Sequence, residues 1–430
     1  MLSKATKPRL SRILVLALLA LAALATSGCV AAPSRGWSGV LVSDNVLYVG
    51  TLEGKIIALD LTTADFSERL APGFKWNPQD VVGSLGSGGF LSCGQVSKPM
   101  GMYGTPVVKD GRVYIAAYDG NVLWVSTDGG SVSGSKFETD GAIVGGMVID
   151  GDTLYVGSSD GRLYALDLNV LDIADSLKDG WPFKTGGEIW STPVVNEGVV
   201  YVASADHNLY AIDTESGNEI WRFETEAAIL STPLVADGTV YIGGCDRKFY
   251  AIDAATEDER VAARNGAEPT TREAESIFEG AGNWFWTQAL AYNGEIWVGC
   301  LDHNVYVLNA ENVAEEVHEP YSTGGMVYSP PVLFPSEGLV VVGSQDGKIY
   351  AINADTKDVT VYVIDANTDE VVEPPEEPTK RLAPILAPMY ADATSGILYF
   401  HAQDGTHTLY AFRLSTKEVL WSFRTDKISG

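Results

Sequence analysis

The chain has 430 residues, 46% of them apolar, so it is long enough and apolar enough to bury a large core. It carries 29 basic and 56 acidic side chains, a net charge of −27 at pH 7. Such a negative field repels phosphate backbones and anionic lipid headgroups, which argues against nucleic-acid binding and against electrostatic docking to a membrane. Four cysteines are too few to hold a fold of this size together by disulfides.

The chain begins with the pattern of an export signal. Residues 1–12 are polar and basic, and Ile13–Ala25 is an unbroken apolar run of thirteen residues. A helix of that length spans only about 20 Å, which is less than the roughly 30 Å hydrocarbon core of a bilayer. We therefore predict a secretory signal over residues 1–28, not a membrane-spanning helix.

The next residues are Thr26-Ser27-Gly28-Cys29. They resemble the bacterial lipobox, in which small residues precede a cysteine that receives diacylglycerol and becomes the mature N-terminus. The resemblance holds from Ser27 to Cys29 and departs at Thr26, where the family usually has leucine. It implies lipidation of Cys29, a tether over 29–35, and anchoring to the outer face of the cytoplasmic membrane, or to the outer membrane if one exists. The alternative is an ordinary secreted protein that is cut nearby.

From residue 36 onward the chain repeats one unit. Ser191–Asp213 and Ser231–Asp253 share a Ser-Thr-Pro start, a Val-Tyr strand and a Tyr-Ala-Ile-Asp strand. Self-similarity at this spacing is typical of repeat architectures. An acidic turn residue before the third strand marks eight copies: Glu53, Asp119, Asp160, Asp206, Asp246, Asp302, Asp346 and Asp404.

Each copy has the pattern of four short strands. Runs rich in Val, Ile, Tyr and Trp alternate with turn residues such as Asp-Gly, and no long stretch keeps a helical period. A sheet with two apolar faces is buried only between neighbours, so the units are expected to stack radially into a ring. We predict an all-β fold, a single eight-bladed β-propeller of four-stranded antiparallel blades over residues 36–425, with seven blades as the alternative.

A tryptophan motif follows the third strand of the best copy. Ala211–Trp221 (AIDTESGNEIW) fits A-x-D-x-x-[ST]-G-x-x-x-W, and Ala411–Trp421 is a weaker copy. The motif resembles the tryptophan-docking repeat of the pyrroloquinoline-quinone (PQQ) quinoprotein propellers and their relatives. Alanine lets the indole approach the backbone, and the indole fills the seam between blades. We expect the indole N–H to find a local acceptor.

The resemblance spans residues 36–425, and its nearest branch is non-enzymatic: the lipid-anchored propeller of the outer-membrane β-barrel assembly machinery and related envelope proteins. It implies a monomeric scaffold that binds envelope proteins through ring-face loops and contacts the membrane only through its lipid. Three insertions, 64–100, 257–282 and 359–379, are the candidate contact loops, the alternative being variable surface loops. Trp286-Thr287 aligns with Trp190-Ser191, so we expect Trp286 in the core.

A PQQ-dependent dehydrogenase is an alternative function. Those enzymes resemble this chain in the repeat, but they have an adjacent Cys-Cys pair against the cofactor and a calcium site. This sequence has no Cys-Cys dipeptide. We therefore predict no enzyme, no catalytic, cofactor-binding or metal-binding residue, and no cofactor. A polysaccharide-binding propeller is a further alternative, which would need exposed aromatic platforms that a sequence does not locate.

Two residue pairs invite a chemical interpretation. Cys245 and Cys300 occupy nearly equivalent points of neighbouring units, one residue out of register. We expect buried free thiols there, with a bridge as the alternative. His207 and His303 stand where other copies have glycine, and we assign them to turns rather than to a metal site.

Asp365-x-Asn367-x-Asp369 has the spacing that begins an EF-hand calcium loop, and Glu376 falls at its twelfth position. Glu370 replaces the glycine that such a loop needs, and two prolines interrupt it. We therefore interpret the segment as a decayed copy of the repeat's own turn, followed by an acidic, proline-rich loop.

Overall fold

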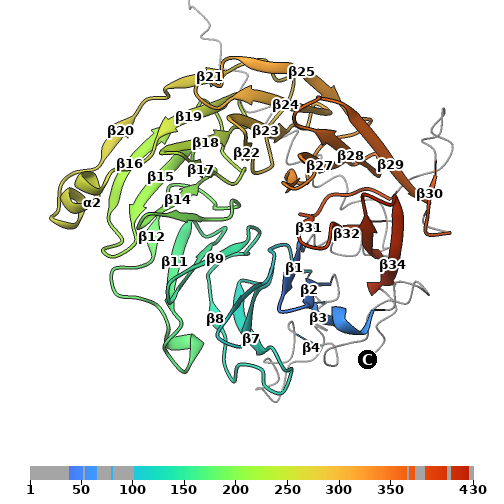
Figure 1. The fold of residues 1–430 in the computed structure, drawn as a ribbon. Coiled ribbons are helices and arrows are strands. Elements are labelled where there is room, and N and C mark those ends of the chain that lie inside the picture. Colours follow the sequence, from blue (N-terminus) through green and yellow to red (C-terminus); the bar gives the residue numbers. More distant parts are fainter. Residues whose placement is uncertain are drawn as a thin grey trace, which may run out of the picture. The chain divides into compact units, whose positions relative to one another are not determined.

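The computed structural model describes residues 38–51, 54–64, 79–80, 101–365, 368–372, 383–403 and 408–425. These residues form eight sheets that follow one another in chain order around a ring, from the blue blade 1 to the red blade 8 beside it (Figure 1). The chain is therefore an all-β eight-bladed propeller, as predicted, and the alternative of seven blades is wrong.

Blades 1 to 3 have four antiparallel strands each. Blade 1 holds β1 Val40–Ser43, β2 Val46–Gly50, β3 Lys55–Asp60 and β4 Gln79–Asp80; blade 2 holds β5 Val107–Lys109, β6 Arg112–Ala116, β7 Asn121–Ser126 and β8 Phe137–Glu138; blade 3 holds β9 Met147–Asp150, β10 Thr153–Gly157, β11 Arg162–Asp167 and β12 Phe183–Lys184.

Blades 4 and 5 are linked by one strand, which follows the third strand of blade 5 in the chain but pairs with the outer edge of blade 4. Blade 4 holds β13 Val194–Asn196, β14 Val199–Ala203, β15 Asn208–Asp213, β16 Glu219–Glu224 and, as a fifth strand, β20 Thr270–Arg272; blade 5 holds β17 Leu234–Ala236, β18 Thr239–Gly243, β19 Phe249–Asp253 and β21 Ser276–Phe278.

Blades 6 to 8 complete the ring. Blade 6 holds β22 Leu290–Tyr292, β23 Glu295–Gly299, β24 Asn304–Asn309 and β25 Glu316–Ser322; blade 7 holds β26 Val332–Phe334, β27 Leu339–Gly343, β28 Lys348–Asn353, β29 Val359–Asp365 and a fifth strand β30 Glu370–Val372; blade 8 holds β31 Tyr390–Asp392, β32 Ile397–Ala402, β33 Thr408–Arg413 and β34 Glu418–Arg424. The helices among the described residues are α2 Glu257–Arg264 and two 3₁₀ turns, η1 Leu61–Thr63 and η2 Ile173–Asp175.

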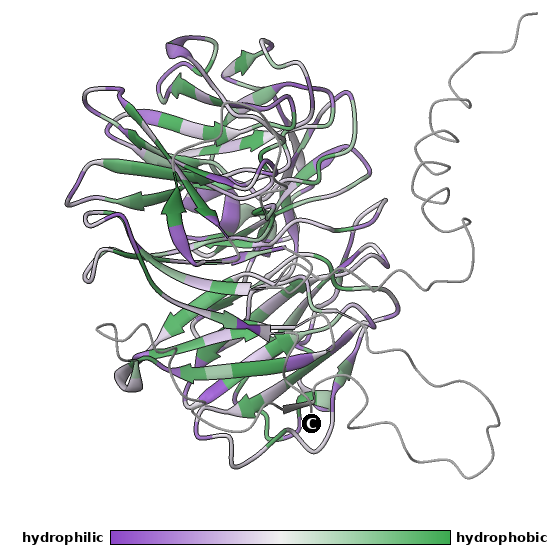
Figure 2. Ribbon diagram, turned by 90° about the vertical axis from the view of Figure 1, so that its right-hand side faces the viewer, coloured by the Kyte–Doolittle hydropathy of each residue, from purple (hydrophilic) through white to green (hydrophobic). Residues whose placement is uncertain are grey.

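The core is divided among the seams between blades. Each of eight apolar clusters draws its side chains from two adjacent blades, and together the clusters occupy all the seams of the ring. Leu47 and Ile57 of blade 1 pack with Tyr399 and Trp421 of blade 8, so the ring closes by packing between the first and last blades. Figure 2 shows the hydrophobic residues gathered in the strands and the hydrophilic ones in the turns.

The docking tryptophans fill seams as predicted. Trp221 and Trp421 are fully buried, and each lies in register with the alanine of its motif, Ala211 or Ala411. The expected acceptor for the indole N–H is wrong, because both indole nitrogens are buried without a hydrogen-bond partner among the described residues. Burying an indole contributes more than the roughly 1–3 kcal/mol that one unpaired donor costs, so packing decides the geometry.

The aspartate that marks the repeat also joins neighbouring blades. In blades 3 to 7 its Oδ2 accepts the hydroxyl of a tyrosine four residues later, at 2.6–2.7 Å, and a backbone N–H from the segment that leaves the preceding blade, at 2.5–3.2 Å. We call each of these arrangements a clamp. The five pairs are Asp160–Tyr164, Asp206–Tyr210, Asp246–Tyr250, Asp302–Tyr306 and Asp346–Tyr350.

The insertion at 257–282 is a strap across blade 4. The chain leaves blade 5 after β19, forms α2, pairs β20 in parallel with β16 at the outer edge of blade 4, and returns to blade 5 as β21 (Figure 1). A capping box between Thr256 and Glu259 starts α2. Arg264 at its other end pairs with the fully buried Asp213 at 2.9 Å.

The insertion at 359–379 is in part a regular strand. β29 is the fourth strand of blade 7, and β30 adds a fifth that contacts β34 of blade 8. The Ser422 hydroxyl donates to Asp369 Oδ2 at 2.6 Å, which ties the hairpin to blade 8. Residues 373–379 lie outside the described residues. So does the insertion 64–100, apart from Ala64 and β4.

Candidate functional site

The ring has two faces that differ in the segments they carry. The connector face holds the connectors from the outer strand of one blade to the first strand of the next, together with the turns between second and third strands, which the clamps join. The turn face holds the remaining turns, between first and second and between third and fourth strands.

Each described connector carries one half-buried residue at what we call an axial position, because the rings of Trp190 and Trp286 meet at this position. The preceding residue is buried in a seam in every described case: Met102, Ile143, Ile189, Ile229, Phe285, Val327 and Ile385. The axial residues themselves are half-buried: Tyr103, Val144, Trp190, Leu230, Trp286, Tyr328 and Leu386.

Three axial residues form an aromatic cluster. Trp286 packs edge to face against Trp190 and against Tyr328, with ring centroids 6.4 Å apart in both pairs. Trp190 belongs to the connector entering blade 4 and Trp286 to that entering blade 6, so the two rings reach each other past blade 5, inside the ring. The Tyr328 hydroxyl donates to Met326 Sδ at 3.1 Å, and burial raises the pKa of Tyr328.

The expectation that Trp286 is a core residue is therefore wrong. Phe285, one position earlier, is fully buried in the seam between blades 5 and 6. Consecutive side chains of an extended segment point to opposite sides, so the next residue faces the axis. Aligning the residue before each Ser-Thr-Pro segment across the repeats would have revealed the axial positions, and the spacing D-x-x-x-Y would have revealed the clamps.

A layer of hydrogen bonds joins the segments next to the aromatic cluster. Gly146 N–H donates to Thr192 Oγ1 at 2.7 Å, and Thr192 N–H donates to Thr232 Oγ1 at 3.1 Å. Gln288 Nε2 donates to the carbonyl oxygen of Pro233 at 2.9 Å. These bonds connect the inner segments of blades 3, 4, 5 and 6 and hold the axial side chains on a fixed frame.

Apolar side chains are also exposed on the loops of both faces. On the connector face, Trp284 is 41% exposed and Tyr118 is 42% exposed, the latter lying 5.2 Å from the ring of Tyr103. On the turn face, Leu171 between β11 and β12 is 88% exposed. A leucine so far out of the core is a candidate contact for a partner.

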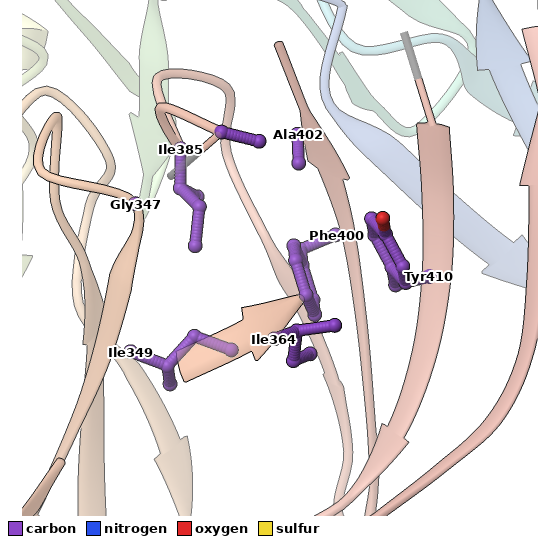
Figure 3. Close-up of a pocket in the computed structure, with 8 residues that line it drawn as sticks. Gly347, Ile349, Ile364, Ile385, Phe400, Ala402 and Tyr410 are labelled. Carbon is purple, nitrogen blue, oxygen red and sulfur yellow. The ribbon is translucent and has the colours of Figure 1, made fainter. Parts of the chain in front are cut away.

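A small hollow lies on the seam between blades 7 and 8 (Figure 3). Its volume of about 10 Å³ holds no more than one water-sized molecule, so it is a packing gap rather than a ligand site. Its wall is almost wholly apolar: Gly347, Ile349, Ile364, Ala383, Ile385, Phe400, Ala402 and Tyr410.

The thiols are free, as predicted for this pair. Cys300 is buried, with Sγ 3.3 Å from the carbonyl oxygens of Asn283 and Trp284, and Cys245 is half-buried. Burial, followed by the charge of Asp246, raises the pKa of Cys245 to about 12, and burial raises that of Cys300 as well. Protonated thiols are poor nucleophiles and poor metal ligands. Cys29 and Cys93 lie outside the described residues.

The two histidines assigned to turns occupy turns, as predicted. His207 and His303 have φ of 78° and 74°, the region that glycine favours in the other copies. The EF-hand spacing also ends in a turn: Asp369 N–H donates to the Asp365 carbonyl oxygen at 2.8 Å, inside the hairpin of β29 and β30. Asn367 and Glu376 lie outside the described residues. In the part of the chain that is described, no three potential ligands gather to hold a metal ion.

The axial residues do not fit PQQ. This cofactor is a tricarboxylate, and its binding calls for positive side chains or a metal ion near its carboxylates. The described axial positions and the adjoining Thr192, Thr232 and Gln288 carry no positive charge. We therefore derive no chemistry through this cofactor.

The ring of repeats agrees with the comparison to known families. The family model described as outer membrane protein assembly factor BamB matches residues 100–170 and 175–423, most of the chain. The chain belongs to this family. No helix within the described ranges is long and apolar enough to cross a bilayer.

One solved structure resembles this chain in fold, and a second superposes on it less closely. The crystal structure of the computationally designed Ika8 protein superposes with a TM-score of 0.62 and 15% identity, over 88% of this chain and 97% of that one. The crystal structure of BamB from Moraxella catarrhalis gives a TM-score of 0.49 and 18% identity, over 76% and 82%. At 15% identity, the likeness to Ika8 extends to the fold alone. No curated protein matches the chain.

Proposed function

We propose that this chain is an exported, lipid-anchored scaffold of the cell envelope that binds other proteins through the loops of its ring faces. Membership of a family named for assembly of outer-membrane proteins supports a protein-binding function. The carrying observation is the exposed Leu171, an apolar side chain on a loop that core packing does not require. The proposal includes a monomeric ring and no catalytic role.

The lipid anchor is the second part of the proposal, and it rests on the sequence Ser27-Gly28-Cys29. Cys29→Ser removes the thiol that would accept diacylglycerol. The wild-type protein is expected in the membrane fraction and labelled by an alkyne fatty acid, and the variant is expected unlabelled. Equal labelling of both proteins would remove the anchor from the proposal.

Site-directed photo-crosslinking in cells tests the scaffold. A photoreactive phenylalanine at Leu171 or Trp284, on loops of opposite faces, is expected to give defined adducts with envelope proteins. The matched control is Val317, 44% exposed on the outer strand β25 rather than on a face loop. Adducts from Val317 alone, or from none of the three positions in correctly folded protein, would contradict binding through the ring faces.

A further inference from the structure

We propose that the aromatic cluster at the ring axis binds a neutral carbohydrate chain. This inference goes beyond the scaffold function and does not depend on it. It starts from Trp190, Trp286 and Tyr328, which come from three different connectors and are half-buried. The Trp286 ring lies 6.4 Å from each of the other two.

The shape of the cluster suits sugar rings. Indole and phenol rings offer flat, weakly negative faces, and the axial C–H bonds of a pyranose are the positive, apolar groups that stack on such faces. Edge-to-face packing of Trp286 between its two partners turns the three rings at angles of 63° and 74° to one another. Successive units of a twisted glycan present their faces at different angles, which this arrangement can follow.

Polar groups lie beside the aromatic faces. Thr192, Thr232 and Gln288 next to the cluster are neutral donors and acceptors, the side-chain types that pair with hydroxyl groups.

Charge selects a neutral ligand. None of the described axial residues is charged, and the protein as a whole carries −27. Nucleotides, phosphorylated lipids and uronic-acid polymers would be repelled without a compensating cation. Protein hot spots typically combine aromatic residues with arginine, and no arginine stands at a described axial position. A neutral glycan is therefore favoured over a protein side chain as the occupant.

Calorimetry and tryptophan fluorescence with four probes test the inference on the full mature chain: maltohexaose, cellohexaose, chitohexaose and laminarihexaose. At least one is expected to bind with a Kd of about 10 μM to 1 mM, a range typical of a few stacking contacts. Trp190→Ala and Trp286→Ala are expected to weaken it by about tenfold or more, while Trp190→Phe, which keeps an aromatic face, loses much less.

Trp124→Ala is the matched control, because this half-buried tryptophan lies on β7, away from the axial positions. It is expected to bind as the wild type does. If Trp286→Ala unfolds, Tyr328→Leu keeps the apolar volume and removes one aromatic face. Absence of binding by all four sugars to folded wild type, or unchanged binding by folded axial variants, would overturn the inference. Loss of protein crosslinks in axial variants without any sugar binding would assign the cluster to a protein partner instead.

Discussion

At Asp160 one carboxylate serves three parts of the ring. Its Oδ1 accepts the Arg162 N–H at 2.9 Å and shapes the turn, while Oδ2 accepts the Tyr164 hydroxyl at 2.6 Å and the Asp140 N–H at 3.0 Å. Hydrogen bonds to a charged acceptor contribute about 1.5–3 kcal/mol each. The same geometry repeats in five blades, so a single residue type sets both the turn and the spacing to the preceding blade.

The clamp predicts an alkaline limit to stability. Burial, then the hydrogen bond to Asp160, raises the pKa of Tyr164 to about 12. Because the ordinary pKa is about 10, the folded state favours the protonated phenol; its contribution is complete below pH 10 and is lost as the pH rises toward 12. Tyr164→Phe is expected to lower the free energy of unfolding by about 1–3 kcal/mol at pH 8 and by less at pH 11.

Urea unfolding at pH 8, 10 and 11 measures this difference. Tyr292→Phe is the control, because Tyr292 is half-buried on β22 and its hydroxyl has no hydrogen bond with the described residues. It should change stability little at any of the three pH values. A penalty for Tyr164→Phe that is equal at pH 8 and 11 would show that the phenol–carboxylate bond does not stabilise the fold.

Among elements, the strap shows how an insertion can stabilise the blade that it crosses. Asp213, the acid of the docking motif, is fully buried and pairs with Arg264 at the end of α2. Burial would raise the pKa of Asp213, but hydrogen bonds from Arg264 and Ser216 outweigh it and lower the pKa. The Arg272 guanidinium from β20 lies 5.7 Å from the ring centre of Trp221. The strap therefore packs on the docking motif whose tryptophan fills the seam between blades 4 and 5.

Arg264→Ala is expected to cost about 2–4 kcal/mol, because it leaves a buried carboxylate with only its Ser216 bonds. Since the folded pKa of Asp213 is depressed, this contribution is present above about pH 4 and is lost as the pH falls through the folded value. Arg260→Ala is the matched control on the same helix, since its partner Glu257 is exposed and stays hydrated when the arginine is removed, so no buried charge is left unpaired. Equal losses in thermal unfolding for the two variants would contradict the buried pair.

Much of each blade follows from the sequence, because its strands, turns and docking tryptophan lie within one repeat. The strap does not, because three strands of blade 5 separate Asp213 from Arg264 in the chain, and only the Thr256-x-x-Glu259 capping box indicates the helix. The axial positions could be predicted by aligning the repeats. The contact between Trp190 and Trp286 could not, because the two residues meet only once the ring has closed.

In the whole molecule, the seams differ in the hydrogen bonds that join neighbouring blades. The clamps join blade 2 to 3 and each following pair up to blade 7. Ile57, Leu123 and Thr408 stand four residues after Glu53, Asp119 and Asp404, where a clamp has tyrosine. The seams between blades 7 and 8, 8 and 1, and 1 and 2 therefore lack the phenol of the clamp. They are also the seams nearest the two ends of the chain.

The closing seam should therefore be where the ring opens first. Trp421→Ala removes a fully buried indole between blades 8 and 1 and is expected to cost about 3–5 kcal/mol. Its effect on hydrogen exchange should concentrate in blades 8 and 1, because their seam lacks the phenol of the clamp. Trp221→Ala is the matched variant in a seam that also has the Asp246–Tyr250 clamp and the strap, so its loss of protection should stay local and smaller. Hydrogen exchange with mass spectrometry compares the two. Equal deprotection of all blades in both variants would mean that the ring unfolds as one unit, and that closure is not its weakest point.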